Sequence, residues 1–215
     1  RGMARAANDD FMLIDIKAVD DRQPMLGELT RLLVKANEDK AVRCVILTGI
    51  GRAFCAGLDL RQERDGEGIS SASSSTNLDL RNTPPTVMFD MDKPIICAVN
   101  GGAAGYGMDT ALGCDIRIMA ESAKMAAAFV KRGVVPESGG TWFLPRMIGW
   151  AKASELIFPG RTLSARECLE WGLANEVVAD GELMGRARAL AREISANAPL
   201  AVQAAKRMMR MGLNE

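Results

Sequence analysis

The segment from residue 98 to residue 118 constrains the fold more than any other part of the chain. It reads AVNGGAAGYGMDTALGCDIRI, which predicts the end of a buried strand, a glycine-rich turn and a helix whose first turn carries Asp109. Glycine lets the backbone approach a ligand closely or adopt a positive φ. The first amides of a helix have no intrahelical acceptor, and the helix dipole there favours negative charge. The turn is therefore a candidate site for an oxyanion, and the alternative is a tight turn that binds no ligand.

Two further glycine-rich turns follow predicted strands. Residues 51–60 (GRAFCAGLDL) come after an apolar strand at 42–48, and residues 132–141 (RGVVPESGGT) come after a strand at 116–119 and open a helix at 142–148. Repeated strand–turn–helix units predict an α/β architecture, with the outline of a stacked ββα spiral.

The flanking regions complete this pattern. We predict a strand at 11–16, a helix at 25–36 and a polar surface segment at 61–85, with a lid over a site as the alternative interpretation of that segment. After Gly149 the spacing of apolar residues predicts four helices, at 151–158, 164–171, 182–196 and 199–211. The methionines at 208, 209 and 211 are interpreted as packing or a subunit interface rather than as a cofactor site.

The composition excludes several classes of protein. There is no histidine, so Ser-His-Asp and Cys-His catalysis and imidazole-bound zinc are excluded. With 27 basic and 27 acidic residues, the chain shows no nucleic-acid footprint. The five cysteines contain no CxxC pair, which predicts reduced, buried thiols in a cytoplasmic protein. No apolar run approaches the ~20 residues of a membrane span, so no membrane association is expected.

Four motifs in order carry a family resemblance. They are GRAFCAGLDL, the 98–118 segment, RGVVPESGGTWFLPRMIG and FPGRTLSARECLEWGLANEVV. Together they resemble the enoyl-CoA hydratase/isomerase family (crotonase superfamily) from about residue 39 onward. The resemblance implies an acyl-CoA-binding ββα spiral core at 1–148 and a C-terminal helical trimerisation region at 149–215. It also implies a homotrimer or a hexamer of two trimers, an acyl-CoA thioester of fatty-acid metabolism as substrate, and no other cofactor or metal.

The resemblance also implies where the substrate binds. The backbone amides of Leu58 and Tyr106 would form an oxyanion hole, with Gly57 and Gly105 beside them and Ala56 next to the adenine of CoA. Donors fixed at the thioester oxygen stabilise an enolate, and removing one such donor typically costs ~3–4 kcal/mol of barrier. Tyr106 replaces a glycine that is more usual in the family. The side chain can vary at this position because the donor would be the backbone amide.

The reaction depends on which carboxylates are present. In family hydratases two carboxylates activate water, at the positions of Asp109 and Phe129, and Phe129 cannot ionise. Glu137 stands in a Pro-Glu-Ser-Gly-Gly setting similar to that of isomerases in the family. We therefore expect one carboxylate, Glu137, to shuttle a proton and shift a double bond, with Asp109 as a second candidate catalytic residue and Phe129 lining the substrate site.

Several alternatives stay open at this point. Asp109 and Glu137 together could still activate water, which would make the chain an enoyl-CoA hydratase. A lyase or thioester hydrolase could use the same enolate, and an acyl-CoA-binding protein without catalysis would need neither carboxylate. Either acid could also be only a favourable partner of a helix N-terminus.

Overall fold

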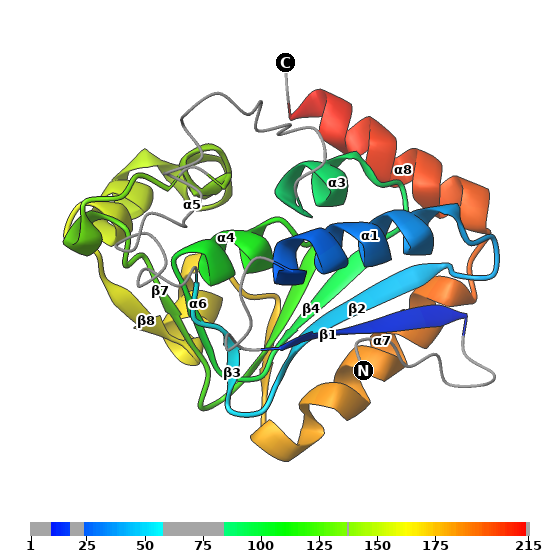
Figure 1. The fold of residues 1–215 in the computed structure, drawn as a ribbon, viewed down its shortest axis with the longest axis horizontal. Coiled ribbons are helices and arrows are strands. Elements are labelled where there is room, and N and C mark those ends of the chain that lie inside the picture. The colour runs from blue at the N-terminus through cyan, green and yellow to red at the C-terminus, as the bar shows by residue number, and fades with distance from the viewer. Residues whose placement is uncertain (1–9, 18–23, 58–83, 137, 214–215) are drawn as a thin grey trace.

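The computed structural model describes residues 10–17, 24–57, 84–136 and 138–213 of the 215-residue chain. The larger sheet has five strands in the order β1-β2-β4-β6-β9, and all neighbouring pairs are parallel. Its members are β1 (Phe11–Lys17), β2 (Cys44–Ile50), β4 (Ile95–Val99), β6 (Ile116–Ala120) and β9 (Glu176–Val178). Helices α1 (Pro24–Glu38) and α7 (Leu183–Ser195) lie on opposite faces of this sheet, which explains the apolar continuity of its central strands (Figure 1).

A smaller sheet stands beside the first, in the order β3-β5-β7-β8. Its strands are β3 (Ala53–Cys55), β5 (Gly102–Ala104), β7 (Lys124–Ala126) and β8 (Thr162–Ser164), of which only the β7–β8 pair is antiparallel. Strands β2, β4 and β6 of the larger sheet are each followed by one short strand of the smaller sheet. This alternation confirms the predicted ββα spiral.

The short elements are where the sequence prediction was incomplete. The 51–60 turn contains β3, and β5, β7, β8 and β9 were missed because three-residue strands leave too little periodicity to detect. Helix α3 (Pro84–Asp90) was also missed, since Pro84-Pro85 suggested a break although proline suits the first turn of a helix. The predicted surface segment at 61–85 lies outside the described residues up to residue 83.

The longer elements agree with prediction. Helix α5 (Gly140–Ile157) joins the two helices expected at 142–148 and 151–158, and it is bent at Gly149, whose φ is 76°. Ser164 and Glu167 form the expected capping box at the start of α6 (Ala165–Trp171). Helix α8 (Pro199–Gly212) follows as predicted, so residues 149–215 supply helices and also the two edge strands β8 and β9.

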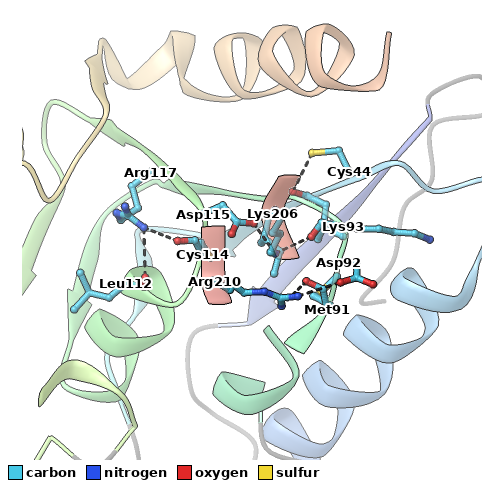
Figure 2. Close-up of polar contacts among 12 residues, drawn as sticks. Cys44, Met91, Asp92, Lys93, Leu112, Cys114, Asp115, Arg117, Lys206 and Arg210 are labelled. Carbon is cyan, nitrogen blue, oxygen red and sulfur yellow. Dashed lines mark hydrogen bonds and ion pairs between the residues drawn. The ribbon is translucent and has the colours of Figure 1, made fainter. Parts of the chain in front are cut away.

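Charged side chains attach α8 to the larger sheet at the amino-terminal ends of its strands (Figure 2). Lys206 Nζ donates to Asp115 Oδ2 (2.7 Å) and to the Lys93 carbonyl (2.9 Å), and Asp115 Oδ2 also accepts from the Ile95 amide (2.7 Å). Lys93 in turn donates to the carbonyls of residues 36 and 39 at the end of α1, and burial lowers its pKa. These contacts hold the end of the chain at the edge of the sheet opposite the glycine-rich turns.

Apolar side chains on α8 are left exposed. Met208 and Met209 are each 71% exposed and Met211 is 62% exposed, so their predicted packing role is not met within this chain. All five cysteines are free and buried, as predicted. Among the described helices, none combines the length and the hydropathy that a membrane span requires.

Candidate functional site

Two glycine-rich segments meet where β3 and β5 end. These strands pair in parallel, and a β-carbon built on Gly57 would lie 3.7 Å from the Tyr106 amide nitrogen and 2.9 Å from the Ala104 carbonyl oxygen. Gly57 has a φ of 98° and Gly105 a φ of 52°, conformations that residues with side chains rarely adopt. The backbone leading to Leu58 and the amide of Tyr106 are therefore neighbours, although Leu58 itself lies outside the described residues. Ala56, beside them, is exposed.

Tyr106 begins α4 (Tyr106–Leu112), and every residue of this helix is buried. The Tyr106 carbonyl accepts from the Thr110 hydroxyl (2.8 Å), and the preceding Gly105 amide donates to the Ala126 carbonyl of β7 (3.0 Å). The tyrosine ring is buried to its hydroxyl oxygen, which exposes less than 1 Å². The side chain therefore points into the protein, which leaves the position tolerant of a residue larger than glycine.

Gly107 brings α4 into direct contact with β3. A β-carbon on Gly107 would lie 2.1 Å from the Cys55 carbonyl oxygen and 2.7 Å from the Cys55 β-carbon, so only glycine fits. Burial raises the pKa of the Cys55 thiol. Cys55 is 1% exposed and lies directly against Gly107, so it is a packing residue here.

Asn100, directly after β4, bonds to the end of β2 and to the turn that follows β2, and the sequence analysis missed it. Its Oδ1 accepts from the Gly49 amide (3.0 Å), and its Nδ2 donates to the Gly51 carbonyl (3.0 Å). A polar side chain between a buried strand and the Gly101-Gly102 pair was the available signal. The amide side chain therefore fixes β2, and through it the start of β3, against the turn that leads to Tyr106.

We expect Asn100→Ala to lower both stability and any activity that uses the Tyr106 amide. Losing these hydrogen bonds leaves main-chain groups unpaired, which costs about 1–3 kcal/mol of unfolding free energy. Urea unfolding would measure the loss. Asn197→Ala is the matched control, because Asn197 makes one exposed bond to the Glu193 carbonyl. An Asn100→Ala variant as stable as that control would contradict this role.

Asp109 lies against the start of α5. Its side chain is 1% exposed, and a β-carbon built on Gly140 would lie 2.4 Å from Asp109 Oδ1 and 3.2 Å from Oδ2. Gly140 comes three residues after Glu137, which is outside the described residues. Thr141 Oγ1 donates to the Pro136 carbonyl (3.4 Å) across the same turn. The structure thus brings Asp109 to the turn that contains the other predicted carboxylate.

Phe129 packs beside Gly105. Its Cε1 is 3.8 Å from a β-carbon built on Gly105, and the side chain is 5% exposed. The side chain predicted to line the substrate site is therefore an apolar ring beside the glycine-rich turn.

Arg117 holds the far end of α4, a role that the sequence analysis did not identify. Its Nη1 donates to the carbonyls of Cys114 (2.6 Å) and Leu112 (3.4 Å) (Figure 2). Nη1 also donates to the carbonyl of residue 111 (3.4 Å), and Nε donates to the Leu173 carbonyl (2.7 Å). Burial lowers the pKa of this guanidinium. A cation at the C-terminal carbonyls of a helix is favourable, so Arg117 anchors the helix whose first residue is Tyr106.

Known proteins resemble this chain over most of its length. A family model described as enoyl-CoA hydratase/isomerase matches residues 22–215. The chain is 42% identical over 172 residues to 1,2-epoxyphenylacetyl-CoA isomerase of Escherichia coli K12, covering 80% of this chain and 66% of that protein. It is 39% identical over 184 residues to carnitinyl-CoA dehydratase of Proteus mirabilis, covering 85% and 69%. The chain thus spans about two thirds of the length of these relatives.

A solved structure agrees with the fold. The enoyl-CoA hydratase of Bacillus anthracis superposes with a TM-score of 0.83 at 32% identity, covering 100% of this chain and 84% of that one. The similarity therefore extends to the whole arrangement of strands and helices.

Proposed function

Because the chain belongs to the enoyl-CoA hydratase/isomerase family, we propose that it binds an acyl-CoA thioester and shifts the double bond of an enoyl-CoA. The backbone amides of Leu58 and Tyr106 would bind the thioester oxygen, and Glu137 would move the proton between two carbons of the enolate. CoA enters as part of the substrate, with Ala56 beside its adenine, and no other cofactor or metal takes part.

The oxyanion hole is supported by the glycine-rich contact between β3 and α4. Removing a proton beside a thioester builds charge on the carbonyl oxygen, and amides already aimed at that oxygen need no reorganisation when the charge appears. The Tyr106 amide is fixed by the contacts of Gly105 with β7, of Gly107 with β3, and of Arg117 with the other end of the helix. Rigid placement of this kind is what an oxyanion donor requires.

The apolar wall at Phe129 is the observation that favours isomerisation over hydration. Adding water to an enoyl thioester needs groups that hold the water and exchange its proton. A buried phenyl ring next to Gly105 can do neither, whereas a single carboxylate can take a proton from one carbon and return it to another. Glu137 is therefore assigned both halves of the proton transfer.

Hydration is the second candidate function. The similarity to carnitinyl-CoA dehydratase favours it, since that relative's name describes the loss of water. In this alternative Asp109 and Glu137 would activate the water together, which requires Asp109 to reach the substrate. The third candidate function is binding of acyl-CoA by a crotonase-fold protein that does not turn it over.

Parallel assays of two substrates test the proposal. The purified chain would receive a β,γ-unsaturated enoyl-CoA in one assay and an α,β-unsaturated enoyl-CoA in the other, with the conjugated thioester followed by absorbance. We expect conjugation to appear in the first assay. Loss of conjugation in the second assay alone would identify a hydratase. Binding of both esters without any spectral change would support the non-catalytic alternative.

The exposed apolar side chains of α8 support a proposed self-association. Met208, Met209 and Met211 are exposed on a helix that charged contacts attach to the larger sheet. Methionine-rich exposed surface is typical of interaction sites. We propose that it contributes to a homotrimer, alone or paired as a hexamer.

A further inference from the structure

We infer that Asp109 is a positioning residue. Its carboxyl group packs against the first residue of α5 and so fixes the turn that carries Glu137 relative to the helix that carries the Tyr106 amide. This inference rests on the proposed function, because it concerns the geometry between the oxyanion donor and the proton-transfer group. It removes Asp109 from the groups that exchange protons with the substrate.

Both carboxyl oxygens of Asp109 lie close to Gly140. A β-carbon at position 140 would lie 2.4 Å from Oδ1, 3.1 Å from Cγ and 3.2 Å from Oδ2 of Asp109, so the whole carboxyl group faces the Gly140 backbone. Gly140 does not have a positive φ, in contrast to Gly139, whose φ is 114°. The backbone conformation therefore does not require glycine at position 140. The carboxyl group is what excludes a side chain there.

Burial separates Asp109 from bulk solvent. Each of its carboxyl oxygens exposes less than 1 Å², and the residue is 1% exposed. A general acid or base must come within about 2.6–3.2 Å of the proton that it transfers, directly or through one water. The carboxyl group of Asp109 is buried and packs against Gly140, so it is placed to hold α4 against the start of α5. Holding two helices together in this way is the work of a positioning residue.

This contact lies close in sequence to both groups of the proposed chemistry. Asp109 is three residues after Tyr106 along α4, and Gly140 is three residues after Glu137. Each partner of the contact thus lies about one helical turn or less from a group proposed to act on the thioester. Misplacing a reacting group by about 1 Å can cost roughly 10²-fold in rate.

Four variants test the inference: Gly140→Ala, Asp109→Asn, Asp109→Ala and the double variant Asp109→Ala/Gly140→Ala. We expect Gly140→Ala to lower kcat by roughly 10²-fold with KM nearly unchanged, because the new methyl group displaces the carboxyl. Asp109→Asn keeps the shape of the side chain and should retain at least about a tenth of kcat with an unchanged pH–rate profile. Gly185→Ala is the control, since a β-carbon there meets nothing within 4 Å.

Thermal unfolding of the same four variants tests the contact without any assay of activity. In the double variant the methyl group added at position 140 occupies space that the carboxyl has left, so its midpoint should lie above that of Gly140→Ala alone. Additive losses of stability would overturn the contact. A loss of kcat of about 10³-fold or more in Asp109→Asn would instead assign Asp109 to proton transfer and overturn the inference. If the wild-type chain turns over no enoyl-CoA, the proposed function fails. The unfolding midpoints of the single and double variants would still test the contact between Asp109 and Gly140.

Discussion

Glu137→Gln is expected to abolish double-bond isomerisation while binding of the CoA ester survives. The amide has the size of the carboxylate but cannot take up and return a proton. General acid–base groups typically contribute ~10²–10⁴-fold to a rate, and Glu137 would perform both transfers, so we expect a loss at the upper end of this range. The measurement is kcat for a β,γ-unsaturated enoyl-CoA, together with the dissociation constant of an unreactive acyl-CoA from calorimetry.

The matched control is Glu121→Gln, which removes a carboxylate from an exposed residue after β6. We expect this variant to turn over substrate at the wild-type rate. Normal turnover by Glu137→Gln would remove Glu137 from the mechanism. A parallel loss of ester binding and turnover would indicate that Glu137 supports the binding site and does not transfer the proton.

The sequence predicted four of the five strands of the larger sheet because these four are long and largely apolar, and it missed the three-residue β9. Strand β6 was expected at 116–119 and runs from Ile116 to Ala120, and β1 was expected to end at residue 16 and ends at Lys17. Five or more consecutive buried residues leave a clear pattern. Helix α6 was predicted equally well, since its capping box is a local signal that does not depend on tertiary contacts.

The second sheet could not be predicted in the same way. Strands such as β5 are three residues long and consist of glycine and alanine, which have little β propensity. They form strands because each directly follows a strand of the larger sheet, which places them side by side. Asn100 links the connection after β4 to the connection after β2. Their structure is therefore set by tertiary contacts.

The roles of the candidate site residues stay predictions, and the structure adds contacts among them that the sequence did not predict. The family resemblance implied Gly57 and Gly105, and the structure brings Gly57 beside the Tyr106 amide. The packing of Asp109 on Gly140 joins residues 31 positions apart (140 − 109) and left no local signal. Leu58 and Glu137 lie outside the described residues, so their roles stay predictions.

Gly107→Ala is expected to have the second large effect, through the backbone of the oxyanion site. The added methyl would lie 2.1 Å from the carbonyl oxygen and 2.8 Å from the carbonyl carbon of Cys55. These are main-chain atoms of a paired strand and cannot rotate away, so α4 must move away from β3. The Tyr106 amide begins that helix and would move with it.

We expect this displacement to lower kcat by at least about 10²-fold, because an oxyanion donor acts only at hydrogen-bond distance. Overpacking of this kind also costs about 1–3 kcal/mol of unfolding free energy. Steady-state kinetics and urea unfolding would measure the two losses on one preparation. Substrate binding away from the thioester oxygen should be retained, so KM should change much less than kcat.

Gly102→Ala separates this effect from the general cost of an extra methyl group in the glycine-rich segment. Gly102 belongs to the same segment, but a β-carbon there meets nothing within 4 Å, and the residue is exposed. We expect its kcat and stability to stay near those of the wild-type chain. If Gly107→Ala loses stability but keeps its kcat, the position of α4 does not control the reaction, and the Tyr106 amide is not an oxyanion donor. A loss confined to kcat/KM in Gly107→Ala, with kcat intact, would instead indicate that α4 serves substrate binding alone.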